Sequence, residues 1–425
     1  MNINPRLPLF SEVGIIALVP DRWGPCWQAR HHIAARLAKF FHVVWIDCPP
    51  TWQESVRWFV RRPKQSVPGA LPENFSVHRA SAWSPNPGRP LGLRNRLSRR
   101  RLEKAHQKLR EHGCSRIVLY LWKPEFADSL ELLDHDLSCY HIDDEYSFSP
   151  VEREIDRKEL ELIRKVDQVF IHSPAMMDKK GKLNPNTQLV PNGVDFQQYT
   201  VPAAEPEELK SIRKPRIGYA GNLKRMLDWD LLLELSRMHP EWAFVFVGRM
   251  LPHLEVQQIY KQLSERENVH ILGPYPTDQV PSYVQHFDVC IMPYKLDDYT
   301  KYIYPLKLHE YLACGKPVVG SPIPALQAFR EVVLLADDAP AWSAQLARAL
   351  SSQENTLERR EVRLAVAAAH DWNLLVETIA ATLARRLGLA VPSSGAENVQ
   401  YADRSRWSKE LIRHNRMVDF ALNKP

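Results

Sequence analysis

A short apolar run near the start of the chain, followed by a helix pattern and a second apolar run, constrains the fold most. Residues 13–19 read VGIIALV and contain no polar side chain. Residues 28–39 place Ile33, Ala34 and Leu37 at helical spacing, and residues 42–47 form the next strand-like run. Continuous apolar strands are typical of parallel sheets that are covered on both faces. The pattern therefore predicts a strand–helix–strand unit of an open, doubly wound α/β sheet.

The same alternation recurs in both halves of the chain. Further strands are predicted at 117–121, 137–142, 167–173, 216–222, 243–247 and 269–272, and helices at 151–165, 229–238 and 372–387. A Pro-, Glu- and Ala-rich stretch at 201–206 predicts a linker. Because 425 residues exceed one ordinary core, we expect Rossmann-like domains at 1–200 and 201–390 and a tail at 391–425.

The composition is that of an ordinary globular protein, with 44% apolar and 25% charged residues. The first twenty residues lack the basic region, apolar core and cleavage site of a secretory signal, and no apolar run approaches about 18 residues. We therefore predict a cytoplasmic protein without a membrane-spanning helix. The six cysteines form no C-x-x-C pair, which predicts reduced thiols and neither a zinc site nor a disulfide framework.

Residues 299–321, YTKYIYPLKLHEYLACGKPVVGS, hold the strongest functional pattern. Pro305 suits the first position of a helix, and Gly315 suits the residue just past its end. Lys307 and Glu310 then share one helical face. A lysine can bind a phosphate and a carboxylate can bind a pair of sugar hydroxyls, so the two together can bind a nucleotide. From these residues alone, an ion pair on a solvated helical face explains the pattern equally well.

Two segments resemble signatures of GT-B glycosyltransferases. Residues 310–319, EYLACGKPVV, are similar to the C-terminal donor-site signature of the retaining family 4 and its bacterial polysaccharide relatives. Residues 188–196, QLVPNGVDF, are similar to the end of the N-terminal domain of that family. The resemblance covers nearly all of 215–324 and is looser before it. It implies a GT-B fold, in which two Rossmann-like, doubly wound domains face each other across a cleft.

The resemblance also implies a nucleotide-sugar site in the C-terminal domain. It implies that Glu310 binds the ribose, that Lys307 is a candidate diphosphate ligand, and that the turn at Gly221 donates N–H groups to the diphosphate. The family usually has a second glutamate eight positions before the first, where this chain has Tyr302. The candidate donor-binding residues are Gly221, Asn222, Lys224, Arg225, Gly248, Arg249, Tyr275, Tyr304, Lys307 and Glu310.

Polar groups also follow two predicted strands of the N-terminal half. Asp143, Asp144 and Glu145 follow the strand at 137–142, at the end where ligands of parallel sheets gather. A metal site, a polar or helix-capping loop, and an acceptor-side or catalytic role all fit these residues. Asp143 and Asp144 are the candidate catalytic bases for an inverting reaction. Trp23 and Gly24, after the first strand, are candidate acceptor-side residues, although an ordinary loop explains them equally well.

Positive charge is concentrated in one region of a chain whose net charge is +6. Residues 89–110 read RPLGLRNRLSRRRLEKAHQKLR, and further basic residues between 57 and 64 lie beside tryptophans. Basic residues interleaved with Leu and Trp are typical of a helix on an anionic membrane surface, and a solvated helical face is the alternative. Nucleic acid is not expected, because no nucleic-acid motif accompanies the charges. The candidate membrane contacts are Arg94, Arg96, Arg99, Arg100 and Arg101.

These observations predict a hexosyltransferase that moves a sugar from a UDP- or GDP-sugar to a hydroxyl of a saccharide or lipid-linked acceptor, in surface polysaccharide synthesis. We expect no metal and no other cofactor, and the resemblance favours retention over inversion. The expected location is the cytoplasm, including the inner face of the plasma membrane. Two alternatives remain open: a sugar-nucleotide 2-epimerase of the same architecture, and a non-catalytic adaptor with a degenerate GT-B fold.

Overall fold

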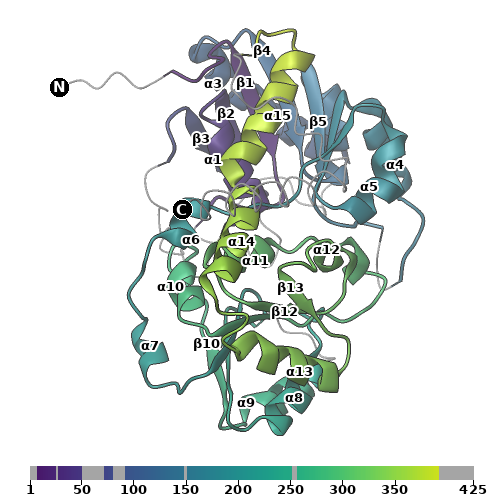
Figure 1. Ribbon diagram of the computed structural model, residues 1–425. Coiled ribbons are helices and arrows are strands. Elements are labelled where there is room, and N and C mark those ends of the chain that lie inside the picture. The colour runs from purple at the N-terminus through teal and green to yellow at the C-terminus, as the bar shows by residue number, and fades with distance from the viewer. Residues whose placement is uncertain are drawn as a thin grey trace, which may run out of the picture. The chain divides into compact units, whose positions relative to one another are not determined.

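The computed structural model describes residues 7–24, 27–49, 71–79, 91–147, 151–250 and 256–391. Its strands form two sheets (Figure 1), with the orders β3-β2-β1-β4-β5-β6-β7 and β10-β9-β8-β11-β12-β13. The first sheet contains β1 Val13–Leu18, β2 His42–Ile46, β3 Phe75–His78, β4 Arg116–Leu121, β5 Leu137–Ile142, β6 Gln168–Ile171 and β7 Thr187–Leu189. The second contains β8 Arg216–Ala220, β9 Ala243–Val247, β10 Val269–Leu272, β11 Val289–Met292, β12 Val318–Gly320 and β13 Val333–Leu335.

Helices connect the strands, and all of the recorded strand pairings are parallel. Those of the first half are α1 Ala29–Leu37, α3 Leu91–Glu111, η1 Pro124–Glu131, α4 Arg157–Lys165, α5 Pro174–Lys180, η2 Gly181–Leu183 and α6 Phe196–Thr200. Those of the second half are α7 Glu207–Lys210, α8 Trp229–Met238, α9 Gln257–Ser264, α10 Val280–Gln285, η4 Thr300–Tyr302, α11 Leu306–Ala313, α12 Pro324–Gln327, α13 Ala339–Leu350, α14 Leu357–Ala368 and α15 Trp372–Arg386. The predicted pair of doubly wound α/β sheets is thus confirmed.

The central strands are apolar because they are covered on both faces. Every residue of β1, β5 and β9 is buried, which explains why these runs show no alternation of polar and apolar side chains. One predicted helix is wrong in its start: residues 151–156 are not helical, and α4 begins at Arg157. The cause is Asp156, whose side chain accepts a hydrogen bond from the backbone N–H of Lys158 and so caps the helix there.

Both sheets belong to one compact unit that ends at Leu383, and the residues from 384 onward form a second, small unit. The predicted boundary between residues 200 and 201 falls between α6 and α7, and it stays a prediction. Beyond Val391, the predicted tail lies outside the described residues. The cysteines Cys114, Cys290 and Cys314 are free and buried, as expected for reduced core thiols. Cys139 is also buried, and Cys26 is outside the described part.

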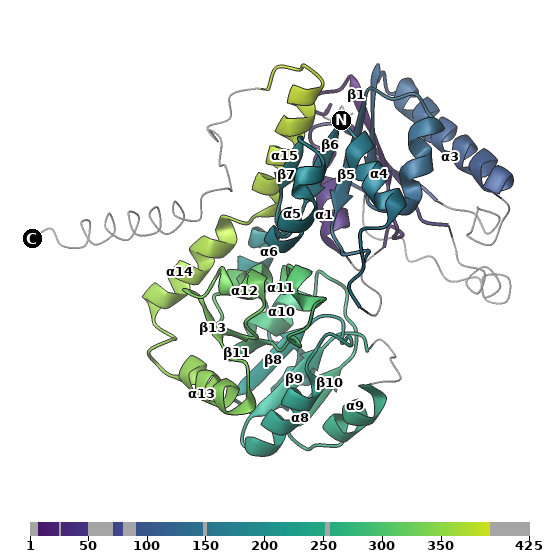
Figure 2. The same cartoon turned by 90° about the vertical axis from the view of Figure 1, so that its right-hand side faces the viewer.

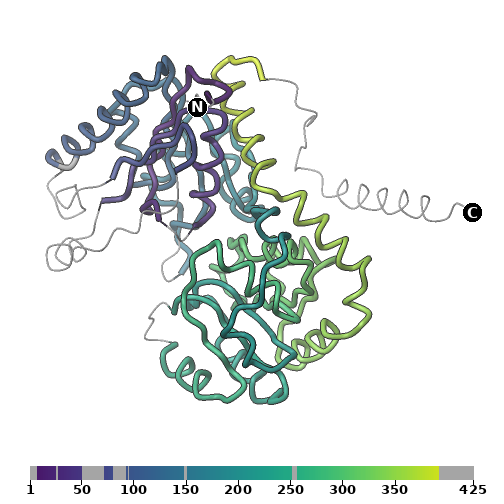
Figure 3. Tube along the Cα trace, turned by 90° about the vertical axis from the view of Figure 1, so that its left-hand side faces the viewer, coloured from purple at the N-terminus to yellow at the C-terminus, as the bar shows by residue number. Residues whose placement is uncertain are grey.

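After the second sheet, the chain returns to the first one (Figure 3). Trp372, the first residue of α15, stacks on His32 of α1 with ring centroids 5.5 Å apart. Farther along α15, the Thr382 hydroxyl donates a hydrogen bond to the Gln188 side chain of β7 at 2.9 Å. The predicted crossing helix at 372–387 is therefore found, one residue shorter than expected.

The basic segment forms α3, which flanks the first sheet (Figure 2). Leu102, Ala105 and Leu109 are buried, and the side chain of Leu109 fills the space beside Gly14 of β1. The side chains of Arg96, Arg99 and Arg100 are exposed, together with that of Leu93. None of the helices that the structure describes is long and apolar enough to cross a bilayer.

One predicted membrane contact requires correction. Arg101 is only partly exposed, and its Nη2 donates a hydrogen bond to the backbone carbonyl of Asp47, just after β2. Arg101 follows the exposed Arg100 by one residue, and a step of about 100° around a helix turns it toward the sheet. The side chain of Arg94 and the basic residues between 57 and 64 lie outside the described part of the structure.

Buried neutral histidines predict a loss of stability in mild acid. Burial lowers the pKa of His370 to about 4 and that of His141 to about 3. Between about pH 6.5 and pH 4 the unfolded chain therefore binds protons that the folded chain does not, so stability present above pH 6.5 is lost as the pH falls. We expect the free energy of unfolding in urea to fall by about 2 kcal/mol per such histidine between pH 7.5 and pH 5. The decrease should be smaller in His370→Phe, and an equal decrease would contradict this assignment.

Candidate active site

Helix α11 is fastened to the end of β8. The Tyr311 hydroxyl donates a hydrogen bond to the Ala220 carbonyl at 3.3 Å and accepts one from the Ala220 N–H at 2.8 Å. Pro305 is the N-cap residue and not the first helical residue, because the helix begins at Leu306. Gly315 follows the helix end with a φ of +69°, as predicted for a glycine that terminates a helix. This attachment holds α11 against the end of β8.

Lys307 of α11 lies directly on the turn after β8. Its Nζ is 5.1 Å from the centre of the Tyr219 ring, and a Cβ added to Gly221 would lie 2.2 Å from Lys307 Cε. Gly248, after β9, approaches the same turn so closely that an added Cβ would lie 2.1 Å from the Gly221 carbonyl oxygen. Both glycines have positive φ, +141° and +150°. Glycine is therefore required at both positions.

Two N–H groups of this turn are already bonded. The N–H of Gly221 donates a hydrogen bond to the Val247 carbonyl at 2.7 Å, so it is not available to a diphosphate. The Leu223 N–H likewise donates to the Arg249 carbonyl at 2.9 Å. The cause is the close approach of the two strand ends, which continues the sheet's hydrogen bonding into the turn. That the turn donates N–H groups to a diphosphate stays a prediction, which these two N–H groups do not serve.

Two lysines, Lys224 and Lys307, meet at this turn. For neither does the structure record a salt bridge to a residue that it describes, although the charges of Glu310 and Lys307, and of Asp144 and Lys224, act on each other. Burial lowers the pKa of Lys224, and the positive charge of Lys307 lowers it further, so the two ammonium groups are close. Unpaired ammonium groups that repel each other are costly in a partly buried site unless an anion binds between them. The pair is a candidate anion site.

Glu310 lies one helical turn from Lys307 and is held by a residue that the sequence did not single out. A hydrogen bond joins it to the hydroxyl of Tyr199, a buried residue of α6. Burial raises the pKa of Glu310, while Lys307 and the Tyr199 hydroxyl counteract this rise. The hydroxyl of Tyr199 orients the carboxylate, and no local sequence pattern marks it because the two residues are 111 positions apart.

The remaining candidate donor-binding residues lie on the turn after β8, after β9 and in the segments before α10 and α11. Asn222 is exposed at the turn itself, Arg225 lies near Tyr299, and Arg249 is exposed after β9. Tyr304 is buried, and its hydroxyl is 3.0 Å from His309 Nε2. Tyr275 stacks on Tyr283 of α10, and its hydroxyl donates to Glu208 at 3.2 Å.

Asp143, after β5, is bound by an arginine. Arg30 of α1 donates two hydrogen bonds to its carboxylate, at 2.5 and 3.0 Å, and also pairs with Asp21. The Tyr146 hydroxyl donates a third hydrogen bond at 3.1 Å. Burial alone would raise the pKa of Asp143, but Arg30 outweighs it and lowers the pKa below the ordinary value. A carboxylate bound in this way is a weak base.

Asp144 is in a different environment. Its carboxylate is exposed and accepts a hydrogen bond at 3.2 Å from the hydroxyl of Tyr299, in the loop that precedes η4 and α11. The charges of Asp144 and Arg30 also act on Lys224. The structure thus brings Asp144 close to Lys224, which the sequence could not show because 80 residues separate the two.

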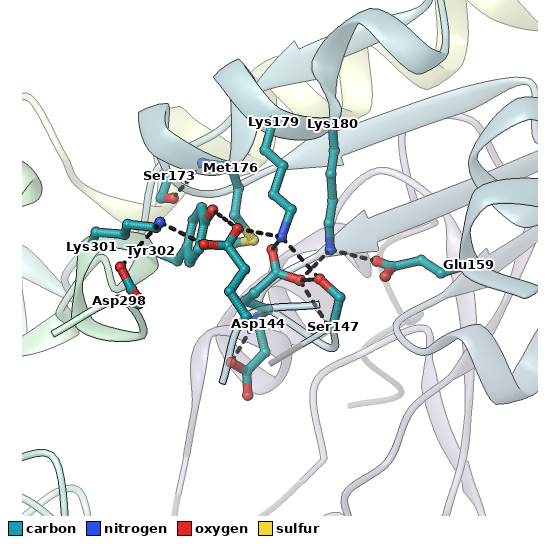
Figure 4. Close-up of polar contacts among 12 residues, drawn as sticks. Asp144, Ser147, Glu159, Ser173, Met176, Lys179, Lys180, Asp298, Lys301 and Tyr302 are labelled. Atoms are coloured by element: carbon teal, nitrogen blue, oxygen red, sulfur yellow. Dashed lines mark hydrogen bonds and ion pairs between the residues drawn. The ribbon is translucent and has the colours of Figure 1, made fainter. Parts of the chain in front are cut away.

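A network of charged residues joins the loop after β5 to the segment before α11 (Figure 4). Glu152 pairs with Lys179 of α5 at 2.9 Å and with Lys301 of η4 at 2.6 Å, and it accepts a hydrogen bond from the Tyr302 hydroxyl. These three donors lower the pKa of Glu152 to about 2. Tyr302, which stands where the family usually has glutamate, is therefore an anchor for this segment.

The contacts of Trp23, one of the two acceptor-side candidates, are those of a core residue, and those of Gly24, the other, do not require glycine. Trp23 is buried, packs on Trp45 and Phe75, and donates its backbone N–H to Asp47 at 2.9 Å. A Cβ added to Gly24 would meet nothing closer than 3.9 Å, so space alone does not require glycine there. Their role toward an acceptor stays a prediction. Within the described residues, no group of three or more His, Cys, Asp or Glu side chains could hold a metal ion.

The two glycines at the turn lead to a prediction. Gly248→Ala should lower the free energy of unfolding by about 2–3 kcal/mol, because its Cβ would meet backbone. Gly221→Ala should cost less, about 1–2 kcal/mol, because alanine is strained at its positive φ although the end of the Lys307 side chain can move away; it should also weaken nucleotide binding. Urea denaturation and UDP titration measure the two effects. Gly273→Ala, where nothing lies within 4 Å, is the control, and an equal loss of stability there would contradict the argument.

The amino-acid sequence is similar to a family of known proteins and to a protein from Bacillus. Residues 214–352 match the model of the family described as glycosyl transferases group 1. The chain is 30% identical over 234 residues to the putative teichuronic acid biosynthesis glycosyltransferase TuaH of Bacillus subtilis (strain 168). That alignment spans 52% of this chain and 57% of the relative.

Solved structures show the same fold. Sucrose-phosphate synthase from Thermosynechococcus elongatus superposes with a TM-score of 0.68 and 18% identity, over 90% of this chain and 99% of the other. Anabaena HepE in complex with UDP-glucose superposes with a TM-score of 0.63 and 16% identity, over 88% of this chain and 99% of the other. The two parallel sheets therefore form the GT-B fold.

Proposed function

Since residues 214–352 form a group 1 glycosyltransferase domain, we propose that this protein transfers a sugar from a nucleotide diphosphate donor to a hydroxyl group of an acceptor. The observation that carries the proposal is the pair of lysines without carboxylate partners, Lys224 and Lys307, at the end of β8. A diphosphate supplies the negative charge that this pair lacks. A related solved protein, HepE, binds UDP-glucose, which supports a UDP-sugar as the donor.

The geometry suggests a division of roles within the site. Glu310, oriented by Tyr199, accepts hydrogen bonds from the two ribose hydroxyls. Lys224 and Lys307 bind the diphosphate. As the bond between the sugar carbon and the phosphate oxygen breaks, negative charge grows on the leaving diphosphate, and the two fixed ammonium groups stabilise it without a metal. The electron pair of that bond stays on the diphosphate, and the acceptor hydroxyl loses its proton as it attacks.

We propose that the reaction retains the configuration of the sugar, with the leaving diphosphate taking the proton of the acceptor. In an inverting reaction a carboxylate would have to act as the base. Asp143 is unsuited to this because Arg30 and Tyr146 occupy its oxygens, whereas Asp144 is exposed. The NMR signal of the anomeric proton in the first product distinguishes the two outcomes. An inverted product together with an inactive Asp144→Asn variant would overturn retention.

The donor assignment is tested by calorimetric titration with UDP, GDP and their sugars, without added metal. Binding of one nucleotide by the wild type and its loss in Glu310→Ala are the expected results. Glu234→Ala, in helix α8 of the same domain, is a matched control and should bind normally. If the folded wild type binds no nucleotide, the transferase proposal fails and a non-catalytic adaptor is favoured. Consumption of the sugar nucleotide without an acceptor would instead favour a 2-epimerase.

We further propose that the acceptor is a saccharide or a lipid-linked saccharide of a surface polysaccharide. The name of the Bacillus relative, a putative teichuronic acid biosynthesis enzyme, supports this. The exposed side chains of Arg96, Arg99 and Arg100 on α3, beside exposed Leu93, would bind an anionic membrane surface. Co-sedimentation with phosphatidylglycerol vesicles, but not with phosphatidylcholine vesicles, should be lost when the three arginines are replaced by Gln.

A further inference from the structure

A second group of cations lies at the edge of the first sheet. The carboxyl ends of β3, β2, β1 and β4 are neighbours in the sheet order. Arg79 follows β3, Arg22 follows β1 and Lys123 follows β4, while α3 adds the side chain of Arg101 beside the end of β2. We refer to these four residues as the basic edge. Ligands of parallel sheets gather at this end of the strands.

Arg101 is the central residue of the basic edge. Its Nη2 donates to the Asp47 carbonyl, while its buried Nε has no hydrogen-bond partner. No carboxylate in the described part of the structure forms a salt bridge with Arg101, whereas Arg30 of α1 pairs with both Asp21 and Asp143. A guanidinium that is largely withdrawn from water, with donor groups left over, is costly unless a ligand completes its hydrogen bonds.

Within the basic edge, Lys123 is the second cation that forms no salt bridge with a described carboxylate. Its Nζ lies 5.6 Å from the centre of the Tyr146 ring, and no salt bridge is recorded for it in that part of the chain. The hydroxyl of Tyr146 in turn contacts the Trp122 carbonyl and Asp143. The basic edge therefore adjoins the strand end that carries Asp143 and Asp144.

Asp47, the acidic residue after β2, does not neutralise the positive charge of the basic edge. Asp47 Oδ1 accepts hydrogen bonds from the Trp23 N–H at 2.9 Å and from Trp45 Nε1 at 3.0 Å. Arg22 and Arg79 also lie close to this carboxylate, and its charge acts on Arg101 as well. Asp47 therefore holds the loops after β1 and β2 together, and a single carboxylate does not neutralise the three arginines near it. Positive charge stays in excess at the basic edge, where Lys123 adds to it.

We infer that the acceptor carries an anionic group, a phosphate or a carboxylate, which binds Arg101 and Lys123 at the basic edge. This inference rests on the proposed transferase function and names its acceptor class. The planar guanidinium of Arg101 offers paired donors that match the oxygens of either group, and the ammonium of Lys123 adds a point charge. The acceptor hydroxyl then lies toward Asp144 and the lysines that bind the donor diphosphate. The donor and the acceptor thus have separate cation sites.

Binding of simple sugars tests the inference. Glucose 6-phosphate, glucuronate and glucose are titrated calorimetrically into the protein, with and without saturating UDP. We expect one of the anionic sugars to bind at least about tenfold more tightly than glucose, and the tighter one identifies phosphate or carboxylate as the recognised group. Arg101→Gln should remove this preference. Arg100→Gln, whose exposed side chain is the neighbour in sequence, should leave it unchanged.

Several outcomes would overturn the inference: binding of none of the three sugars, equal affinity for charged and neutral sugars, or equal effects of Arg100→Gln and Arg101→Gln. If Arg101→Gln does not fold, Lys123→Gln decides by the same preference. The UDP titration separates this inference from the proposed function. Binding of UDP without preference for an anionic sugar removes only the acceptor class. Preference for an anionic sugar without any nucleotide binding removes the transferase and leaves the anion site.

Discussion

Lys307→Met should lower kcat/KM for sugar transfer by about 10²–10³-fold, because it removes one of the two cations that stabilise the leaving diphosphate. Methionine preserves the packing of the side-chain methylenes on Tyr219 and Gly221, so the free energy of unfolding should change little. The measurement is the steady-state rate of UDP or GDP release, together with a urea denaturation curve for each variant.

Lys261→Met is the matched control for this experiment. Lys261 lies on α9 of the same half, is 78% exposed, and has a Glu265 contact of 3.8 Å that contributes little. It should transfer sugar at the wild-type rate. Loss of activity in both variants, or full activity in Lys307→Met, would contradict the role of Lys307 as a diphosphate ligand.

Lys180→Met should lower the free energy of unfolding by about 3–5 kcal/mol. Lys180 of α5 is fully buried and pairs with two buried carboxylates, Glu159 at 2.8 Å and Glu145 at 3.1 Å (Figure 4). Removing the ammonium leaves both carboxylates without this cation. Urea denaturation measures the loss, and Lys182→Met, at a nearby exposed position, should change stability by less than about 0.5 kcal/mol.

A second variant separates loss of charge pairing from loss of packing. Glu159→Gln removes one of the unpaired charges, so the double variant with Lys180→Met should recover part of the lost stability. If the double variant is less stable than Lys180→Met alone, the cost comes from packing and not from unpaired charge. The network also holds the loop after β5, since Glu145 accepts hydrogen bonds from Ser147. Activity should therefore fall together with stability.

Much of the fold could be read from local patterns. Continuous apolar runs predicted parallel strands because both faces of such sheets are covered, and β1, β5 and β9 are buried at every residue. The helix at 229–238 was predicted with its observed bounds. The start of α4 was not, because the helical pattern from Val151 onward does not show that Asp156 caps the helix.

Local sequence patterns predicted only part of the candidate site. Lys307 and Glu310 are three residues apart, so helical geometry alone placed them on one face. Arg30, Tyr199, Tyr299 and Glu152, which hold the neighbouring groups, are each more than 90 residues from the partner that they contact there. No spacing rule connects residues at that separation. The sequence also could not show that the N–H of Gly221 is bonded to the Val247 carbonyl, because this bond depends on β9, a separate strand.

The amino-acid sequence by itself determined the α/β class, the central strands of both sheets, and the placement of Lys307 and Glu310 on one face of α11. These features depend on hydrophobic periodicity and helix geometry over a few neighbouring residues. Only the tertiary structure decided which charges form salt bridges: Asp143 does so with Arg30 and Glu159 with Lys180, whereas neither Lys224 nor Lys307 does so with a described carboxylate. Charge pairing acts over a few ångströms in space, and folding determines which distant residues come within that range.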